Sequence, residues 1–328
     1  MTKRGAVGTI VVTGANGFVG YALCSFLHSA GHDVRRVVRD LAAESGADGA
    51  AIGETGPDTD WRVVLEGVDV VVHLAARAHV IRDEASDPLG AFRAVNVTGT
   101  ATLARAAARV GVRRLIYLSS VKVNGEYTGR APFRESDTPV PKDAYGLSKY
   151  EAEQVLWQIA AETGLEVTIL RPPLVYGPGV KANFLRLLQW VDGGFPLPLA
   201  SVKNQRSLLY VGNLVDAIVT CLSHPAAAGQ LFLLSDGEDI STPVLIRRLA
   251  TALARRPHLL PFPPVLLRFA AARVGKEKEG DRLLGSLTVD STRIRQRLGW
   301  NPPYSMAEGL RSTISWFRGM DVSYSEDR

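Results

Sequence analysis

Tyr145 and Lys149 lie one helical turn apart, and together they offer a phenol and an ammonium group that could move a proton. A phenol alone has a pKa of about 10, which makes it a poor acid or base at neutral pH. A lysine held nearby would lower the pKa of the phenol by charge attraction, and Ser120, at the end of a strand-like run, could bond the same reacting oxygen. On spacing alone, however, an exposed Tyr/Lys pair on a helix surface is favoured over proton exchange at Tyr145, because such pairs are common on helices.

A glycine-rich turn near the start of the chain is the second pattern that could serve a binding site. Gly14, Gly17 and Gly20 follow a short β-branched run and precede a stretch of helical periodicity. Backbone N–H groups at the start of such a helix can hold a pyrophosphate. The spacing is Gly-x-x-Gly-x-x-Gly rather than the Gly-x-Gly-x-x-Gly fingerprint. We therefore predict a dinucleotide site, with close packing of helix against strand as the alternative reason for the glycines.

The elements that must position these residues alternate along the first half of the chain. Stretches of helical periodicity, such as 92–110, separate strand-like apolar runs at 9–12, 34–38, 68–74, 115–119 and 167–170. Strands alternating with helices predict an α/β fold with a doubly wound, parallel (Rossmann-type) sheet. After residue 172 the alternation fails and prolines and glycines cluster. We expect a dinucleotide-binding domain at 1–172, to which some later segments return, and a smaller mixed C-terminal domain at 173–328 that mainly binds substrate.

Composition excludes several classes of function. The chain is 46% apolar and 22% charged, as in an ordinary globular enzyme, and its net charge of +5 mildly favours anionic ligands. Because the basic residues are scattered, nucleic-acid binding is not expected. Cys24 and Cys221 lie far apart and outside any metal-binding pattern, so no metal site is predicted. Neither a signal peptide nor a membrane span is indicated, and we expect a cytoplasmic protein.

The two signatures, taken together, resemble those of the extended short-chain dehydrogenase/reductase family. Its Thr-Gly-x-x-Gly-x-x-Gly and Tyr-x-x-x-Lys motifs occur here in the same order, beginning at Thr13 and Tyr145. Nearly the whole chain is covered, because further matches occur at residues 73–76, 96–99, 119–120 and 171–179. The resemblance overturns the reading of Tyr145 and Lys149 as a surface pair.

The resemblance implies a role for each matching residue. Tyr145 becomes the proton donor or acceptor, Lys149 lowers its pKa and holds the nicotinamide ribose, and Ser120 polarises the substrate carbonyl. Asn96 becomes a structural residue that ties its helix to the adjacent strand. The implied cofactor-binding set, besides Tyr145 and Lys149, is Gly14, Asn16, Gly17, Phe18, Val19, Gly20, Arg39, Glu54, Leu74, Ala75, Ala76 and Pro172.

The choice of cofactor depends on the end of the second strand. NAD-binding relatives carry an acid there for the ribose hydroxyls, whereas this chain has Val38 followed by Arg39. An arginine suits the 2′-phosphate of NADP, so NADP is favoured over NAD. Asp40 keeps the alternative open, because a shift of the alignment by one or two residues would place it at the acid position.

Later motifs resemble the branch of the family that acts on nucleotide sugars. Arg206 matches the arginine that grips the diphosphate, although it could merely cap a loop, and Asn183 begins the helix that binds the same group. Arg282 is a weaker candidate, and Lys122 borders the reacting sugar together with Asn124. Leu174 replaces an asparagine common in relatives, which predicts the loss of one polar contact to substrate.

These resemblances predict hydride transfer to or from C4 of a UDP-linked sugar. The segments 119–126 and 172–184 resemble a bacterial polysaccharide-biosynthesis subgroup that makes UDP-N-acetylquinovosamine-type sugars, which implies a 4-keto-6-deoxy-N-acetylhexosamine as substrate in surface polysaccharide biosynthesis. Arg39 favours an NADPH-consuming reductase within that subgroup. The alternatives are a UDP-sugar 4-epimerase with retained NAD and a non-catalytic cofactor-binding scaffold. A 4,6-dehydratase is disfavoured, since Val121 and Lys122 stand where an acidic pair is needed. Apolar helix faces at 92–110 and 150–161 are consistent with a homodimer, and equally with packing on the sheet.

Overall fold

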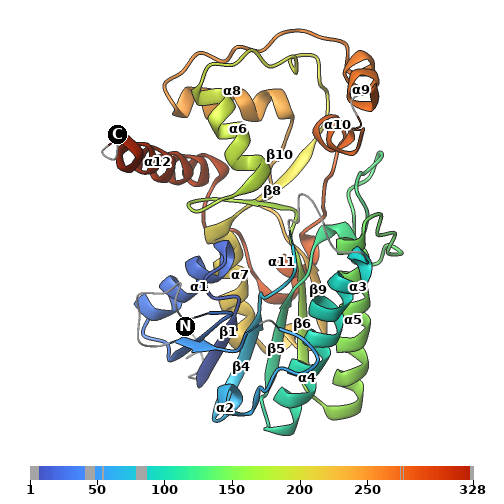
Figure 1. The fold of residues 1–328 in the computed structure, drawn as a ribbon, viewed down its shortest axis with the longest axis vertical. Helices are drawn as coiled ribbons and strands as arrows, with labels where there is room; N and C mark the ends of the chain where they lie inside the picture. The colour runs from blue at the N-terminus through green and yellow to red at the C-terminus, as the bar shows by residue number, and fades with distance from the viewer. Residues whose placement is uncertain are drawn as a thin grey trace.

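The computed structural model describes residues 7–40, 49–53, 55–78, 87–273, 275 and 277–325. Its centre is a seven-stranded sheet in the order β3-β2-β1-β4-β5-β6-β9, in which every neighbouring pair is parallel (Figure 1). The strands are β1 (Thr9–Thr13), β2 (Val34–Val38), β3 (Gly49–Ala51), β4 (Val68–His73), β5 (Arg114–Leu118), β6 (Glu166–Arg171) and β9 (Gln230–Leu233). The predicted doubly wound α/β class is confirmed.

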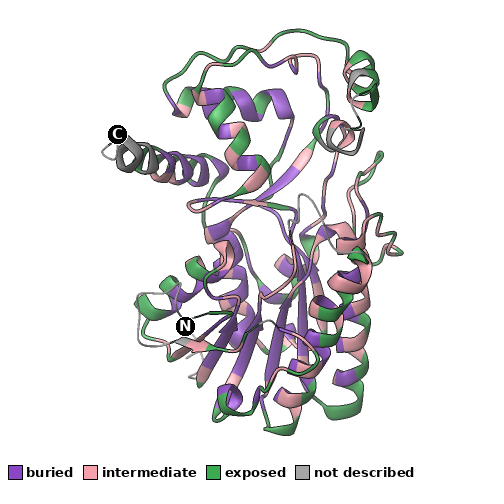
Figure 2. Cartoon of the chain, in the orientation of Figure 1, coloured by how far each residue is buried: buried purple, intermediate pink, exposed green. Residues whose placement is uncertain are grey.

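Helices cover both faces of this sheet because the strands are apolar on both sides, as strands of parallel sheets usually are (Figure 2). One face packs against α1 (Phe18–Ser29), α7 (Val211–Ser223) and α11 (Thr292–Leu298). The other packs against α2 (Arg62–Leu65), α4 (Thr100–Arg109) and α5 (Ala144–Thr163). Successive β4 residues alternate between the faces, with Val71 in one core cluster and Val70 and Val72 in the other.

The helix expected at 92–110 is divided into three parts. α3 (Pro88–Arg93) continues into η2 (Ala94–Gly99), a π-helical turn, and then into α4. Gly111, with a φ of +80°, ends the helix as predicted. π-Helical turns occur frequently at functional sites. Here the turn carries Asn96, whose side chain makes specific contacts described below.

A second, three-stranded sheet has the order β10-β8-β7. It consists of β7 (Leu174–Tyr176), β8 (Arg206–Tyr210) and β10 (Asp239–Ile240), and β10 pairs antiparallel with β8 while β7 pairs parallel with it. The helices of this region are α6 (Ala182–Asp192), α8 (Thr242–Ala252), α9 (Pro264–Arg273), α10 (Glu277–Leu284) and α12 (Met306–Ser325). α6, α8 and α12 share one core cluster with the second sheet. The division of the chain into domains at residue 172 stays a prediction.

Short 3-10 turns complete the described elements, with η3 at Val121–Val123 and η4 at Pro225–Ala227. Among the residues that the structure describes, no helix combines the length and the apolar character that crossing a lipid bilayer requires.

Candidate active site

The glycine loop joins β1 to α1 in a space that admits almost no side-chain atoms. Gly14 has a φ of +67°, and a Cβ there would lie 2.9 Å from the backbone nitrogen of Ala75. A Cβ at Gly20 would lie 2.1 Å from the carbonyl oxygen of Gly14. Gly17 caps the start of α1 and donates its N–H to the same carbonyl at 2.9 Å. A backbone without side chains before the start of a helix fits a pyrophosphate. The close packing of the loop is a second, independent reason for glycine at positions 14 and 20.

Gly20→Ala is expected to destabilise the fold by about 1–3 kcal/mol, because the added methyl group must displace the loop backbone. Urea unfolding would measure the loss. Gly129→Ala is the matched control, since a Cβ at Gly129 would have no neighbour within 4 Å, and it should leave the midpoint unchanged. Equal midpoints for the two variants would contradict the packing argument.

A cavity of about 330 Å³ opens beside the glycine loop. Seven residues of the predicted cofactor-binding set line it, namely Gly14, Asn16, Gly17, Arg39, Leu74, Ala75 and Ala76. Phe18 and Val19 instead pack against the core clusters, and the Pro172 carbonyl accepts a hydrogen bond from Val121. Glu54 lies outside the described residues. The structure thus brings together the residues predicted around the loop and the ends of β2 and β4.

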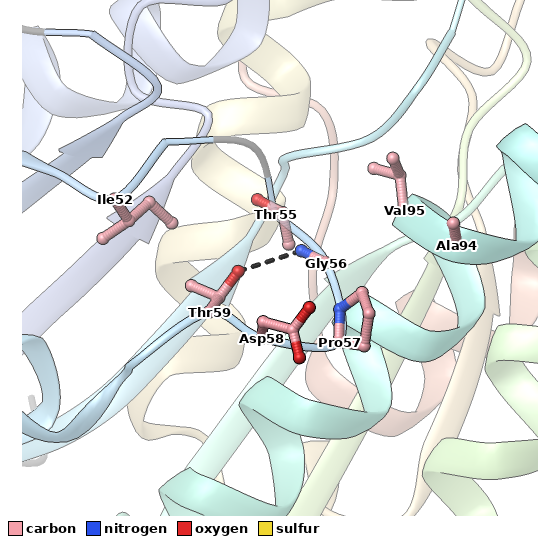
Figure 3. A pocket seen from close by; sticks show the side chains of 8 residues that line it. All are labelled: Ile52, Thr55, Gly56, Pro57, Asp58, Thr59, Ala94 and Val95. Carbon is pink, nitrogen blue, oxygen red and sulfur yellow. Dashed lines mark hydrogen bonds between the residues drawn. The ribbon is translucent and has the colours of Figure 1, made fainter.

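A second cavity of about 340 Å³ adjoins the first and shares Ile52, Thr55 and Val95 with it (Figure 3). Its floor is a tight turn in which the Thr59 hydroxyl accepts a hydrogen bond from the Gly56 N–H at 2.9 Å. The two cavities therefore lie next to each other along these three residues.

A buried chain of hydrogen bonds fixes the wall of the cavity at the end of β4. Thr100 donates to the carbonyl of Asn96 at 2.7 Å, so it must accept from Nε2–H of His73 at 3.0 Å. Nδ1 of His73 then accepts from the Thr13 hydroxyl at 2.7 Å. The same Thr13 oxygen accepts from the two backbone N–H groups that follow His73, at 3.2 Å each. A neutral imidazole therefore holds the loop that lines the cavity.

His73 makes the stability of the protein depend on pH. Burial, together with the charge of Lys149, lowers the pKa of His73 from 6.5 to about 3. Below pH 6.5 the unfolded chain therefore binds a proton that the folded protein does not bind. The free energy of unfolding should fall by about 1.4 kcal/mol for each unit by which the pH is lowered in this range. Urea titrations between pH 7 and pH 5 would measure this slope.

The control for this prediction is removal of the titrating group. His73→Gln should lose most of the slope between pH 7 and pH 5 and keep only the part near pH 7 that Lys149 causes, whereas the same change at the exposed His28 should keep the full slope. An unchanged slope in His73→Gln would show that other groups cause the pH dependence.

Asn96 links three segments around the cavity. Its Oδ1 accepts from the backbone N–H of Arg77 at 2.8 Å, and its Nδ2 donates to the Arg77 carbonyl at 3.1 Å and to Oγ of Ser148 at 2.9 Å. The buried amide thereby holds the segment after β4 against α5. This arrangement agrees with the structural role expected for Asn96.

Tyr145 lies in the first turn of α5, in a polar cluster with Lys122. Asp143 caps this helix by accepting the Gly146 N–H at 2.7 Å. The Lys122 ammonium forms ion pairs with Asp143 and, at 3.3 Å, with Glu126, and it lies 5.8 Å from the centre of the Tyr145 ring. Lys122, predicted to border the sugar, thus lies beside Tyr145 with its charge balanced by two carboxylates.

The prediction that Lys149 lowers the pKa of Tyr145 is wrong for the side chains as this structure places them. Burial and the negative charge of Asp143 raise the pKa of Tyr145 to about 12, and a hydrogen bond with Ser120 opposes this only in part. The Lys149 ammonium lies 6.0 Å from the centre of the Tyr145 ring and donates to the Leu118 carbonyl at 2.8 Å. The helical spacing brings the two side chains together, but the lysine bonds to the end of β5 instead of the phenol.

Lys149 is itself perturbed by its surroundings. Burial lowers the pKa of Lys149 to about 7, while the charge of Glu153 raises it. Its ammonium also lies 4.5 Å from the centre of the Tyr117 ring, where a cation is favoured. The lysine therefore changes its charge near neutral pH, and Glu153 is the carboxylate that favours the charged form.

A buried polar network lies behind these residues. The Arg171 guanidinium donates through Nε to Oε1 of Glu153 at 2.9 Å, through Nη2 to Oε2, and through Nη1 to Oδ1 of Asn124 at 2.9 Å. Ser119 donates to the same Oε1. Asn124 was expected to border the sugar, but its amide is buried in this network and donates to the Arg134 carbonyl at 3.1 Å. Ser119 is thus bound inside the fold, while Ser120 contacts Tyr145.

The remaining substrate candidates lie in the second region. Arg206, on β8, is half-buried and donates to the Gly285 carbonyl at 3.2 Å. Asn183 is exposed in the first turn of α6, and Leu174, 39% exposed, begins β7. Arg282 belongs to α10, and its side chain is outside what the structure describes.

Sequence reasoning missed Glu153 and Arg171. The sequence held a pattern that could have identified Glu153. It lies four residues after Lys149, which lies four residues after Tyr145, so all three share one face of α5. Arg171 ends a buried strand, which is a position where an arginine requires a partner.

Comparison with known proteins gives a consistent picture. Residues 10–234 match the model of the NAD dependent epimerase/dehydratase family. The chain is 44% identical to a UDP-glucose 4-epimerase of Vibrio cholerae, over 94% of this chain and 95% of that one. It is 29% identical to an N-acetyl-alpha-D-glucosaminyl-diphospho-ditrans,octacis-undecaprenol 4-epimerase of Escherichia coli O157:H7, over 94% of each chain.

Among solved structures, the protein MoeE5 in complex with UDP-glucuronic acid and NAD superposes with a TM-score of 0.79. It is 26% identical to this chain, and the match covers 95% of this chain and 100% of that one. The matched region includes the glycine loop, the Ser120 strand end and the Tyr145 helix. The chain therefore belongs to the NAD dependent epimerase/dehydratase family of enzymes, within the extended short-chain dehydrogenases/reductases.

Proposed function

We propose that this enzyme is a UDP-sugar 4-epimerase that retains NAD through its catalytic cycle. The observation that carries the proposal is the 44% identity to a UDP-glucose 4-epimerase along nearly the full length of both chains. That likeness favours the epimerase over the 4-keto reductase that the sequence motifs alone had favoured. The complete set of Ser120, Tyr145 and Lys149 argues against a non-catalytic scaffold.

In this proposal Tyr145 exchanges the proton of the sugar 4-hydroxyl group. It takes the proton as a phenolate while C4 is oxidised to a ketone, and it returns the proton after the 4-keto sugar has turned in the site. Ser120 bonds the same oxygen and so holds it near the phenol. When bound, NAD would accept and return the hydride of C4, and its positive charge would favour the phenolate.

Lys149 supports this exchange through its charge. Its protonated form favours the phenolate of Tyr145, and Glu153 favours that protonated form. Lys122 would lie beside the sugar while neutralising Asp143, whose negative charge raises the pKa of Tyr145. Arg206 would bind the diphosphate of the nucleotide through its guanidinium, with Asn183 on the neighbouring helix.

NAD is the proposed cofactor because MoeE5, at 26% identity, holds NAD in its structure. The preference for NADP had depended on Arg39. This arginine lines the cavity, and its side chain is exposed. An exposed arginine at this edge is compatible with either cofactor, and the likeness to an NAD-containing structure supports NAD.

The test begins with the purified protein and no added cofactor. Denaturation should release NAD, and the untreated protein should interconvert UDP-glucose and UDP-galactose, or their N-acetylated forms, as followed by nuclear magnetic resonance. Oxidation of NADPH in the presence of a UDP-4-keto-6-deoxy-N-acetylhexosamine, without interconversion of C4 epimers, would establish the reductase instead. No turnover in either assay, with cofactor still bound, would favour the scaffold.

A further inference from the structure

An apolar surface lies exposed on α9 and on the loop that leads to it. Five large side chains along this segment are exposed, and we call them together the α9 face: Leu260 (51% exposed), Phe262 (39%), Val265 (74%), Leu266 (51%) and Phe269 (57%). Val265 and Phe269 are four residues apart on the helix, and Leu266 and Phe269 are three apart, so they share one side of α9. We propose that the α9 face docks the protein on membranes that carry anionic phospholipid headgroups.

The α9 face is presented by well-anchored backbone. Leu197 donates its N–H to the carbonyl of His258, and Leu260 donates its N–H to the carbonyl of Leu197, each at 2.8 Å. Leu259 and Leu267 turn inward and pack against the core cluster of the second region. Both sides of the segment are therefore apolar, and the outer side is not needed for the protein's own core.

The charge around the α9 face favours a membrane over a protein partner. Residues 255–273 contain four arginines and no aspartate or glutamate. The Arg273 guanidinium lies 4.4 Å from the centre of the Phe269 ring, and Arg268 is 56% exposed while pairing with Asp281 at 3.4 Å. Arg255 and Arg268 pair with carboxylates of other elements, Asp192 at 3.0 Å and Asp281 at 3.4 Å, so the excess of positive charge comes from the remaining arginines. Apolar side chains in a segment whose own charged residues are all basic are typical of the interface of an anionic bilayer.

The position of α9 allows docking without covering the cofactor cavity. α9 lies at the end of the molecule remote from the seven-stranded sheet and packs against α10, as Figure 1 shows. Figure 2 shows the outer side of α9 in the colour of exposed residues. Because α10 leads to Gly285, which contacts Arg206, the α9 face belongs to the same region as the proposed diphosphate site.

Vesicle flotation tests the proposal with the full chain. Vesicles of pure phosphatidylcholine are compared with vesicles of phosphatidylcholine and phosphatidylglycerol, at low and at high salt. The protein should float with the anionic vesicles at low salt, and binding should weaken as salt screens the arginines. The double variant Leu266→Glu with Phe269→Glu should lower the bound fraction about tenfold, because two charges would enter the interface.

Matched controls separate docking from misfolding. Val63→Glu, at a position 81% exposed on α2, should bind vesicles like the wild type, and the single variant Val265→Glu should weaken binding without affecting unfolding. Epimerase activity on soluble UDP-sugars should be the same in all variants, so that docking is judged independently of the proposed function. The proposal fails if the wild type does not float with anionic vesicles or if the double variant floats equally well. It also fails if sedimentation shows that the double variant only loses self-association, because the α9 face would then join two copies of the chain.

Discussion

Tyr145→Phe is expected to lower turnover in the proposed epimerase reaction by about 10²- to 10⁴-fold, the usual contribution of a positioned acid–base group. The phenylalanine ring fills the same space but can neither take nor return the proton of the sugar hydroxyl. The hydrogen bond between the phenol and Ser120 is also lost. Turnover is measured by nuclear magnetic resonance on the UDP-sugar, and bound NAD by its release on denaturation.

Tyr150→Phe is the matched control for this substitution, since Tyr150 lies in the same helix one residue after Lys149. It should leave turnover and bound NAD near wild-type values. If Tyr145→Phe retains turnover, the phenol takes no part in the reaction. Loss of bound NAD together with turnover would instead give the phenol a role in cofactor binding.

Glu153→Leu is expected to destabilise the protein by about 3–5 kcal/mol, because the guanidinium of Arg171 would be buried without its carboxylate. Glu153 is fully buried, and Arg171 is 3% exposed. The change would also remove the negative charge that favours the protonated form of Lys149. Urea unfolding measures the loss of stability, and turnover of the folded variant measures the effect on the site.

Two variants show whether the buried pair is the cause. Adding Arg171→Met to Glu153→Leu should recover much of the lost stability, because the remaining partner is no longer charged. Glu151→Leu, in the same helix, breaks a half-exposed pair with Arg93 and should cost no more than about 1 kcal/mol. If the two leucine variants are equally stable, the network does not carry the stability assigned to it.

The sequence predicted the elements whose patterns are local. Apolar runs located β1, β2, β4, β5 and β6. The glycine spacing located the β1–α1 loop, where the tight contact between Gly14 and Gly20 leaves no room for other residues. Tyr145 and Lys149 were found because their spacing matches the Tyr-x-x-x-Lys motif of the family, which places both residues on one face of α5.

Other features depend on contacts between distant residues and left no local pattern. The raised pKa of Tyr145 results from burial and from Asp143, while Lys149 bonds to the Leu118 carbonyl on another element. The π-helical turn at η2 interrupts a stretch whose composition favours a regular helix. Asn124 shows the same difficulty, because its amide could have faced either the sugar or Arg171.

The position of β9 has a consequence for how the chain folds. β9 completes the seven-stranded sheet by pairing with β6, but the second sheet is built from residues between them and after β9. A fragment that ends at residue 172 would leave the edge of β6 unpaired and would lack α7 and α11, which cover one face of the sheet. Such an edge invites pairing with other chains. We therefore expect the edge of β6 to stay unpaired during synthesis until β9 has left the ribosome, and slow synthesis of the second region to favour aggregation.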